Sequence, residues 1–247
     1  MLANRRASLL EPAYVLHRRA YRETSAIAEL LTAEHGRLGV VVRGVRSKRS
    51  PWQALLQPFT PLSVSWQARG ELGTLTDVEL RGRPTLPTGQ RLLCGFYLNE
   101  LLLRLLQRED PYPELFERYA SALALLAGSG AEQPLLRSFE RDLLAAMGYG
   151  LSLSHDASGD PIESQRWYRY EIELGAIPVT LPRGQLVVQG ATLHALASGI
   201  FPDATAEAQA RRLMRAALRP HVGERPLKSR ELYARYLRMK PAASAEG

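Results

Sequence analysis

The pattern of apolar and polar residues divides the chain into two parts. Up to about residue 83, apolar residues occur in short runs or alternate with polar ones, which is typical of β-strands. Strands are predicted at residues 14–21, 37–42, 62–66 and 75–80, and residues 25–32 fit either a further strand or a helical turn. Ser50 as an N-cap, followed by Pro51, predicts a short helix at residues 51–56, after the third strand.

Five short strands with a small helix after the third match a closed Greek-key barrel of the OB type. This barrel is a common platform for oligonucleotides. A turn is expected at residues 34–36, where Gly36 can take a left-handed conformation. Another small β-barrel without a nucleic-acid role would give the same pattern, because a fold alone does not determine a function.

From residue 90 onward the apolar residues recur at helical spacing. Helices are predicted at residues 90–108, from residue 113 and from residue 134, and the first carries an apolar stripe of Leu98, Leu101, Leu102, Leu105 and Leu106. Residues 151–188 lose this period and are expected to form an extended flap with two short strands. Helices then return at about residues 192–197, after a cap at Asp203 or Thr205, and after a cap at Ser229.

The last predicted helix should turn Leu232, Tyr233, Tyr236 and Leu237 inward. The sequence therefore predicts an α+β protein with two domains. Residues 1–83 form a five-stranded OB-fold β-barrel, and residues 84–247 form a mainly α-helical domain that includes the flap at about residues 151–188.

The charge of the chain is unevenly distributed around a net value of +7. Residues 1–83 carry 13 Lys and Arg against 7 Asp and Glu, residues 84–210 carry 9 against 15, and residues 211–240 carry 10 against 2. Two separate basic regions point to contact with a polyanion more strongly than uniform basicity would.

The first basic region centres on residues 37–50, which read RLGVVVRGVRSKRS. An apolar strand leads here into a cationic loop, so a rigid base would carry a mobile anion-binding surface. A solvated loop without a ligand is the alternative. Single-strand binders combine such charges with aromatic rings on which bases stack. Tyr14, Tyr21 and Trp52 are candidate rings, whereas Trp66 is expected in the barrel core.

The candidate nucleic-acid contacts in the first region are Arg37, Arg43, Arg46, Lys48, Arg49 and Trp52. Those in the second region are Arg211, Arg212, Arg215, Lys228 and Arg230. The sequence does not rank the four charges of the loop.

Signatures of catalysis and of metal binding are missing from the sequence. It contains no G-x-x-x-x-G-K-[ST] phosphate loop and no G-x-S-x-G nucleophile motif, and its five histidines are scattered. The single cysteine, Cys94, excludes an intramolecular disulfide and a Cys-rich zinc site. His155, Asp156 and Asp160 could be assembled into a metal site, but a hydrated loop is the favoured interpretation.

The apolar runs fall short of the ~18 residues that a membrane span needs, and the N-terminus has no apolar core of signal-peptide length. We therefore expect a cytoplasmic, nucleoid-associated binding protein that is not an enzyme and has no cofactor.

Five segments of the chain resemble the bacterial RecO family of recombination mediators and DNA-repair proteins. They read VVRGVRSKRS, ALLQPFTPL, YLNELLLRLL, FERDLLAAMGYG and PLKSRELY, and the similarity extends from about Tyr14 to Met239. The resemblance implies an N-terminal OB-fold and a C-terminal helical domain. It also implies binding of single- and double-stranded DNA, annealing of complementary strands, and contact with RecR, with the RecA-loading machinery and with the acidic C-terminal tail of single-stranded DNA-binding protein.

Many RecO-like proteins carry a four-cysteine zinc module that this chain lacks. The corresponding region, residues 149–170, contains no cysteine, so the chain resembles the zinc-free branch, and packing of Trp167, Tyr168 and Tyr170 should hold the region instead. An apolar groove rimmed by Arg137 and Arg141, between the first and third helices of the helical domain, is the candidate site for the acidic tail. An RNA-binding OB-fold protein, a DNA-processing enzyme and an adaptor that binds only proteins remain as alternatives.

Overall fold

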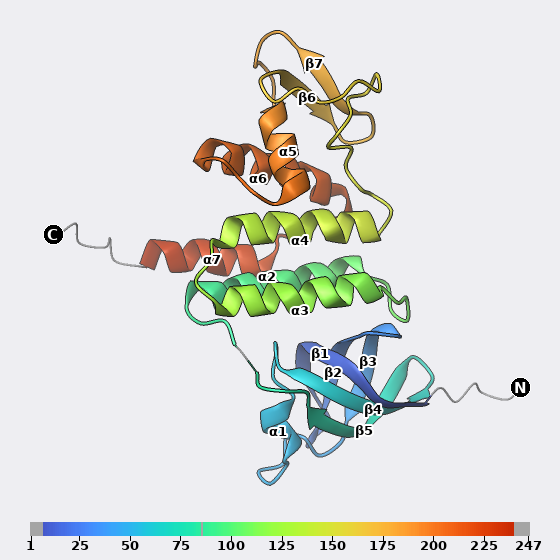
Figure 1. Ribbon diagram of the computed structural model, residues 1–247. Helices are drawn as coiled ribbons and strands as arrows, with labels where there is room; N and C mark the ends of the chain where they lie inside the picture. The colour runs from blue at the N-terminus through green and yellow to red at the C-terminus, as the bar shows by residue number, and fades with distance from the viewer. Residues whose placement is uncertain (1–6, 85, 240–247) are drawn as a thin grey trace, which may run out of the picture. The chain divides into compact units, whose positions relative to one another are not determined.

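A computed structural model of the chain describes residues 7–84 and 86–239 (Figure 1). The chain forms two compact units. The first comprises Met1–Gly128 together with Pro226–Gly247, and the second comprises Ser129–Arg225.

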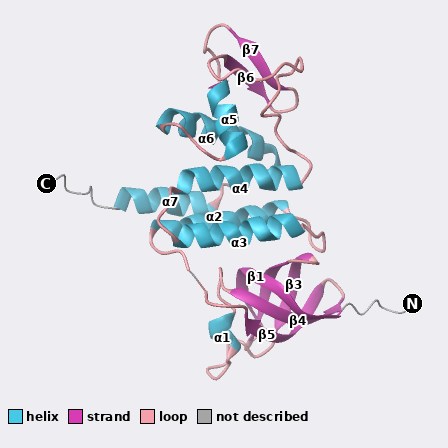
Figure 2. Cartoon of the chain, in the orientation of Figure 1, coloured by secondary structure: helices cyan, strands magenta, loops and turns pink. Residues whose placement is uncertain are grey.

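A closed barrel of five strands opens the first unit (Figure 2). The strands are β1 (Ala7–Tyr21), β2 (Ser25–Thr32), β3 (Gly36–Val42), β4 (Pro61–Arg69) and β5 (Leu72–Leu80). Their order around the barrel is β1-β2-β3-β5-β4, and β4 pairs with β1 to close it. Only β3 and β5 run parallel. The predicted α+β class and OB-type barrel are therefore confirmed, and residues 25–32 form a strand.

The barrel core is formed by apolar side chains at alternate positions of the strands, because every second side chain of a strand points inward. The register of β2 and β3 pairs inward-facing residues with each other: Ala26 with Val42, Ala28 with Val40, and Leu30 with Leu38. Gly36 supplies the turn between these strands at φ 67°, as expected, and a Cβ there would lie 1.9 Å from the Asp110 carbonyl oxygen.

The short helix α1 (Trp52–Leu55) contributes the side chains of Trp52 and Leu55, which pack against the barrel core. The predicted Ser50 cap is wrong. Pro51 occupies the N-cap position in a helical conformation, and no side chain accepts a hydrogen bond there.

Three further helices belong to the first unit: α2 (Gln90–Leu105), α3 (Pro113–Ala127) and α7 (Lys228–Met239). α2 contacts β1, α3 and α7. It ends three residues earlier than predicted. The ring of Tyr14 on β1 packs on Phe116 and Tyr119 of α3, with centroid distances of 5.6 and 5.2 Å.

The N-terminus of α7 differs from the prediction. The helix begins at Lys228, and Ser229 lies inside its first turn, where its hydroxyl donates a hydrogen bond to the Glu100 carboxylate of α2. Leu232 and Leu237 were expected inward but are 50% and 47% exposed, because α7 packs on one neighbouring helix and leaves most of its surface in solvent.

The second unit combines three helices with a small sheet. Its elements are α4 (Glu132–Ala146), β6 (Trp167–Glu171), β7 (Gly175–Val179), β8 (Val187–Gln189), α5 (Gly190–Ser198) and α6 (Ala204–Val222). The sheet order is β7-β6-β8, and the three-residue strand β8 was not predicted. Tyr168 and Tyr170 are buried as expected, and Asp203 caps α6 by accepting the backbone N–H of Ala206 at 2.7 Å.

Candidate nucleic-acid interface

The loop between β3 and α1 is anchored rather than free along its first half. Val42 and Val45 both point into the barrel core, where Val45 is 1% exposed. Gly44 lies between them at φ 65°, which lets the chain reverse while both valines stay buried. Arg43 lies between the two valines and Arg46 follows Val45, and both side chains are exposed. The first half of the loop is thus held by the barrel core, and the mobility of the loop stays a prediction.

Arg46 ties this loop to the turn between β1 and β2. Its Nη1 donates to the carbonyl oxygens of Arg22 and Glu23 at 3.1 and 3.3 Å. Its backbone N–H donates to the Thr24 carbonyl at 2.8 Å. Two loops that are separate in sequence thus form one surface at this end of the barrel.

The end of β1 and the turn after it add positive charge that was not among the predicted contacts. Arg19 and Arg22 are exposed, and the Arg22 guanidinium lies over the Tyr21 ring at 5.1 Å. A short basic run next to a hairpin turn was the signal that could have identified them. Neither side chain forms an ion pair or a hydrogen bond with the residues that the structure describes.

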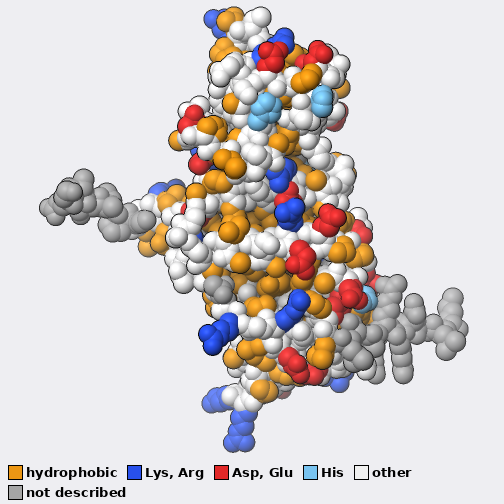
Figure 3. All heavy atoms as spheres, viewed as in Figure 1, with side chains coloured by type: hydrophobic (Ala, Val, Ile, Leu, Met, Phe, Trp, Pro, Cys, Tyr) orange, Lys and Arg blue, Asp and Glu red, His pale blue; other side chains and the backbone are white. Residues whose placement is uncertain are grey.

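We call two segments together the two-loop surface: residues 19–24, which are the end of β1 and the turn after it, and the loop residues 43–50. Its exposed cations are Arg19, Arg22, Arg43, Arg46, Lys48 and Arg49. In Figure 3, basic side chains project at the lower end of the view, over the loop that precedes α1.

The candidate rings differ in their availability to a nucleobase. Trp66 is buried as expected, 3% exposed, with His35 edge-on to it at 5.3 Å. Tyr14 is occupied by its contacts with α3. Trp52 is half-buried against the barrel core and follows the loop of residues 43–50 by two positions. Tyr21 is half-buried beneath Arg22.

Arg37 occupies a different place from the other predicted contacts. Its Nη1 donates to the Leu103 carbonyl near the end of α2. Burial lowers the pKa of this guanidinium, although the negative charge of Glu29 opposes the shift. Arg37 therefore connects β3 to α2, and it is only partly accessible.

The second basic region is divided between the two units. Arg211, Arg212 and Arg215 are exposed on α6 of the second unit, where Arg212 also donates to the Val187 carbonyl at 3.1 Å.

Lys228 and Arg230 belong to α7 of the first unit. Lys228 is exposed, whereas Arg230 donates to the Tyr97 hydroxyl at 2.9 Å and covers the Tyr97 ring at 5.2 Å. The ring contact and the hydrogen bond hold the Arg230 guanidinium against α2.

The two arginines proposed for the acidic tail lie on α4. Arg137 is buried and pairs with the buried Glu140 at 2.6 Å. Arg141 is partly exposed, donates to the carbonyl oxygens of Leu196 and Ala197, and pairs with Asp142 at 2.7 Å. Both guanidinium groups thus have partners within the second unit.

Neither a metal centre nor a membrane span is found among residues 7–84 and 86–239. No group of three His, Cys, Asp or Glu side chains there is placed to hold a metal ion. Asp156 instead accepts the backbone N–H groups of Ser158 and Asp160, which shapes its own loop. No helix of this part of the chain combines the length and the apolar character needed to cross a bilayer.

Comparison with known proteins assigns both parts of the chain to one family. Residues 8–83 match the family model described as "Recombination protein O N terminal", and residues 86–231 match "Recombination protein O C terminal". The DNA repair protein RecO of Nitrosococcus oceani is 50% identical over 228 residues, which cover 91% of this chain and 92% of that protein.

Two further relatives have similar sequence identities and coverages. The DNA repair protein RecO of Halorhodospira halophila is 48% identical over 226 residues, which cover 90% of this chain and 95% of that protein. That of Pseudomonas aeruginosa PAO1 is 49% identical over 220 residues, with coverages of 89% and 92%. This chain therefore belongs to the RecO family of DNA repair and recombination proteins, which are mediators and not enzymes.

Proposed function

We propose that this RecO-family protein binds single- and double-stranded DNA through the two-loop surface and anneals complementary strands there. The observation that carries the proposal is the group of exposed cations on two loops of an OB barrel. Arg19, Arg22, Arg43, Lys48 and Arg49 form no ion pair with the described residues, so their charge is available to phosphates.

Annealing needs no bond-making chemistry. Two DNA strands repel each other because both are polyanions, and a cationic surface that holds both lowers this repulsion and raises their local concentration. The half-exposed ring of Trp52 adds a place where an unpaired base can stack, which is worth about 1–3 kcal/mol per base in other proteins.

We further propose separate roles for the two sequence regions. Residues 1–83 supply the main DNA contact, and residues 84–247 contact the protein partners, namely RecR and the acidic tail of single-stranded DNA-binding protein, so that RecA can be loaded. Arg211, Arg212, Arg215, Lys228 and Arg230 form a second DNA contact or receive an acidic partner. For the acidic tail, Arg137 and Arg141 remain the proposed contacts, although Arg137 would have to exchange Glu140 for the tail.

The test of this function removes charge from the loop. The triple variant Arg43→Ala, Lys48→Ala, Arg49→Ala should lower the affinity for single-stranded DNA by about 10- to 100-fold, because three charge-assisted contacts are lost. The slope of log K against log salt should shrink by about 0.7 for each phosphate contact removed. Fluorescence anisotropy measures both quantities.

A matched control removes three exposed arginines of the second unit, Arg166→Ala, Arg169→Ala and Arg183→Ala. It should leave the affinity nearly unchanged. Both variants are then assayed for annealing of strands coated with single-stranded DNA-binding protein, with and without that protein's acidic tail. A loop variant that binds and anneals like the wild type would show that the DNA site lies elsewhere.

A further inference from the structure

Arg46 differs from the other cations of the two-loop surface in how its guanidinium is used. Arg43, Lys48 and Arg49 form no hydrogen bond with the described residues, whereas Arg46 Nη1 contacts two carbonyl oxygens, those of Arg22 and Glu23. The donor is charged and both acceptors are backbone groups at a loop surface. Such hydrogen bonds are stronger than those between neutral groups.

The residue that receives this hydrogen bond has a strained backbone. Arg22 has φ 52°, in the left-handed region that residues other than glycine rarely occupy. Conformations of this kind are unfavourable for residues with a side chain and persist where surrounding contacts hold them. Arg46 supplies such contacts from another loop, through its side chain and through its N–H group on Thr24.

The strained turn positions the side chain of Arg22. The backbone of Arg22 is in the left-handed region, and its guanidinium lies over the Tyr21 ring. Tyr21 pairs with Ser25 at the end of the β1–β2 hairpin, which is the end to which Arg46 is bound. A released turn would lose this arrangement, because a three-residue loop has several accessible conformations.

We propose that Arg46 is a positioning residue that locks the β1–β2 turn to the β3–α1 loop, and that the turn with Arg22 and Arg19 is a second DNA-contacting segment. Arg46 then acts on DNA mainly through the turn that it holds and less through a phosphate contact of its own. This inference rests on the proposed DNA-binding function. It adds the β1–β2 turn as a second DNA-contacting segment and gives Arg46 a positioning role.

The test compares two substitutions that keep the positive charge. Arg46→Lys retains one charge but loses the planar guanidinium and part of its reach, so the two carbonyl contacts should be lost. Arg183→Lys makes the same change at an exposed arginine of the second unit, whose side chain forms no hydrogen bond with the described residues. Single-stranded DNA affinity should fall about fivefold for Arg46→Lys and stay within twofold for Arg183→Lys.

Three further readouts separate a positioning role from a direct phosphate contact. The salt slope of Arg46→Lys should fall by about 0.7 although no charge is removed, because Arg22 no longer meets its phosphate. Arg22→Ala should weaken binding in the wild-type background and have little effect in the Arg46→Lys background, so the two losses should not add. Hydrogen exchange of residues 20–26 should be faster in Arg46→Lys than in Arg183→Lys.

The outcomes distinguish this inference from the function on which it rests. A wild-type chain that binds no DNA overturns the proposed function. If the wild type binds DNA and Arg46→Lys binds equally well, or if the effects of Arg22→Ala and Arg46→Lys are additive, the positioning role is wrong and the DNA site stands without it. Equal thermal unfolding midpoints for Arg183→Lys and Arg46→Lys, with the affinity loss confined to Arg46→Lys, support the role.

Discussion

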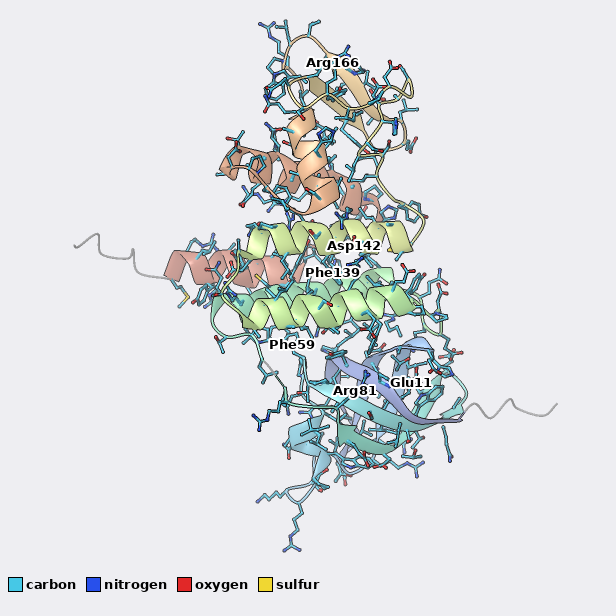
Figure 4. The ribbon with its side chains drawn as sticks, viewed as in Figure 1. Glu11, Phe59, Arg81, Phe139, Asp142 and Arg166 are labelled. Atoms are coloured by element: carbon cyan, nitrogen blue, oxygen red, sulfur yellow. The ribbon has the colours of Figure 1, made fainter. Side chains whose placement is uncertain are left out.

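At the scale of single residues, Glu11 is the most constrained charged side chain of the barrel wall (Figure 4). It is 3% exposed on β1, and its Oε1 accepts the backbone N–H groups of Glu34 and His35 at 2.8 and 3.1 Å. Its Oε2 lies 2.8 Å from His35 Nδ1 and 3.5 Å from Trp66 Nε1. One carboxylate thus organises the β2–β3 turn.

The pKa of Glu11 is lower in the folded protein than the ordinary value of a glutamate. Burial alone would raise this pKa, but the hydrogen bond from the Glu34 N–H and the positive charge of His35 outweigh burial and lower it. A carboxyl whose pKa is lower in the folded than in the unfolded state stabilises the fold above its unfolded pKa of about 4.3. That contribution is lost as the pH falls through the folded pKa.

We therefore predict that Glu11→Gln destabilises the protein by about 1–3 kcal/mol at pH 7, because a charged acceptor of backbone N–H groups is removed. Urea unfolding from pH 7 to pH 3 should show the difference between variant and wild type shrinking below about pH 4. Glu34→Gln, at an exposed neighbouring carboxylate, is the control and should change little. A constant difference across the pH range would contradict this account.

At the scale of elements, α7 depends on a cap supplied by another helix. Glu100 of α2 accepts the backbone N–H groups of Lys228 and Ser229 at 3.0 and 2.9 Å and the Ser229 hydroxyl at 2.6 Å. The first N–H groups of a helix have no partner within it, and a negative charge there also interacts well with the helix dipole. Burial would raise the Glu100 pKa, but these hydrogen bonds and Arg104 lower it.

Glu100→Ala should therefore cost about 1–2 kcal/mol, as the loss of a good N-cap does. Hydrogen exchange should report faster exchange in residues 228–239 and little change in the barrel strands. Glu231→Gln removes an exposed negative charge from the same helical turn and should have a much smaller effect. Equal effects of the two variants would mean that the charge alone, and not the cap, stabilises α7.

At the scale of the whole molecule, the barrel is joined to α2 and α3 in one compact unit. Two linked, buried hydrogen bonds connect β1 to α2 and α3. Asn99 Nδ2 donates to the Leu16 carbonyl at 2.9 Å, and the Tyr119 hydroxyl donates to Asn99 Oδ1 at 2.5 Å. Tyr119 is fully buried, and burial holds its pKa well above the usual value.

Removing the Tyr119 hydroxyl should lower the free energy of unfolding of the first unit. Tyr119→Phe leaves Asn99 Oδ1 buried without its hydroxyl donor and should cost about 1–3 kcal/mol in urea unfolding. Tyr112→Phe removes a hydroxyl bound to Asp110 at a partly exposed site and is the matched control. A larger loss for Tyr112→Phe would show that the buried hydrogen bonds do not stabilise the unit.

Much of the architecture follows from the pattern of residues. Alternation at residues 62–66 and the β-branched run at residues 38–42 predicted strands because the two-residue period of a strand appears directly in the sequence. Leucines at helical spacing predicted α2 in the same way. The strand β8 was missed because three residues are too short to show a period.

The candidate site was predictable only as a region. Three features can be read from the residues alone: where positive charge gathers, that an apolar strand leads into it, and to which family the motifs belong. The positions of charged residues can be read from the sequence, but their hydrogen-bond and ion-pair partners cannot. Only the tertiary structure placed Arg46 on the carbonyl oxygens of a distant turn, Arg37 against α2 and Arg137 beside a buried glutamate.

The physical reason is that side-chain spacing tells which residues share a face, whereas folding decides which faces are covered and which polar atoms meet. Arg22 and Arg46 lie 24 residues apart and meet because β1, β2 and β3 pair as neighbours around the barrel. Their contact depends on strand order and register, which arise from the packing of the complete barrel and not from either segment alone.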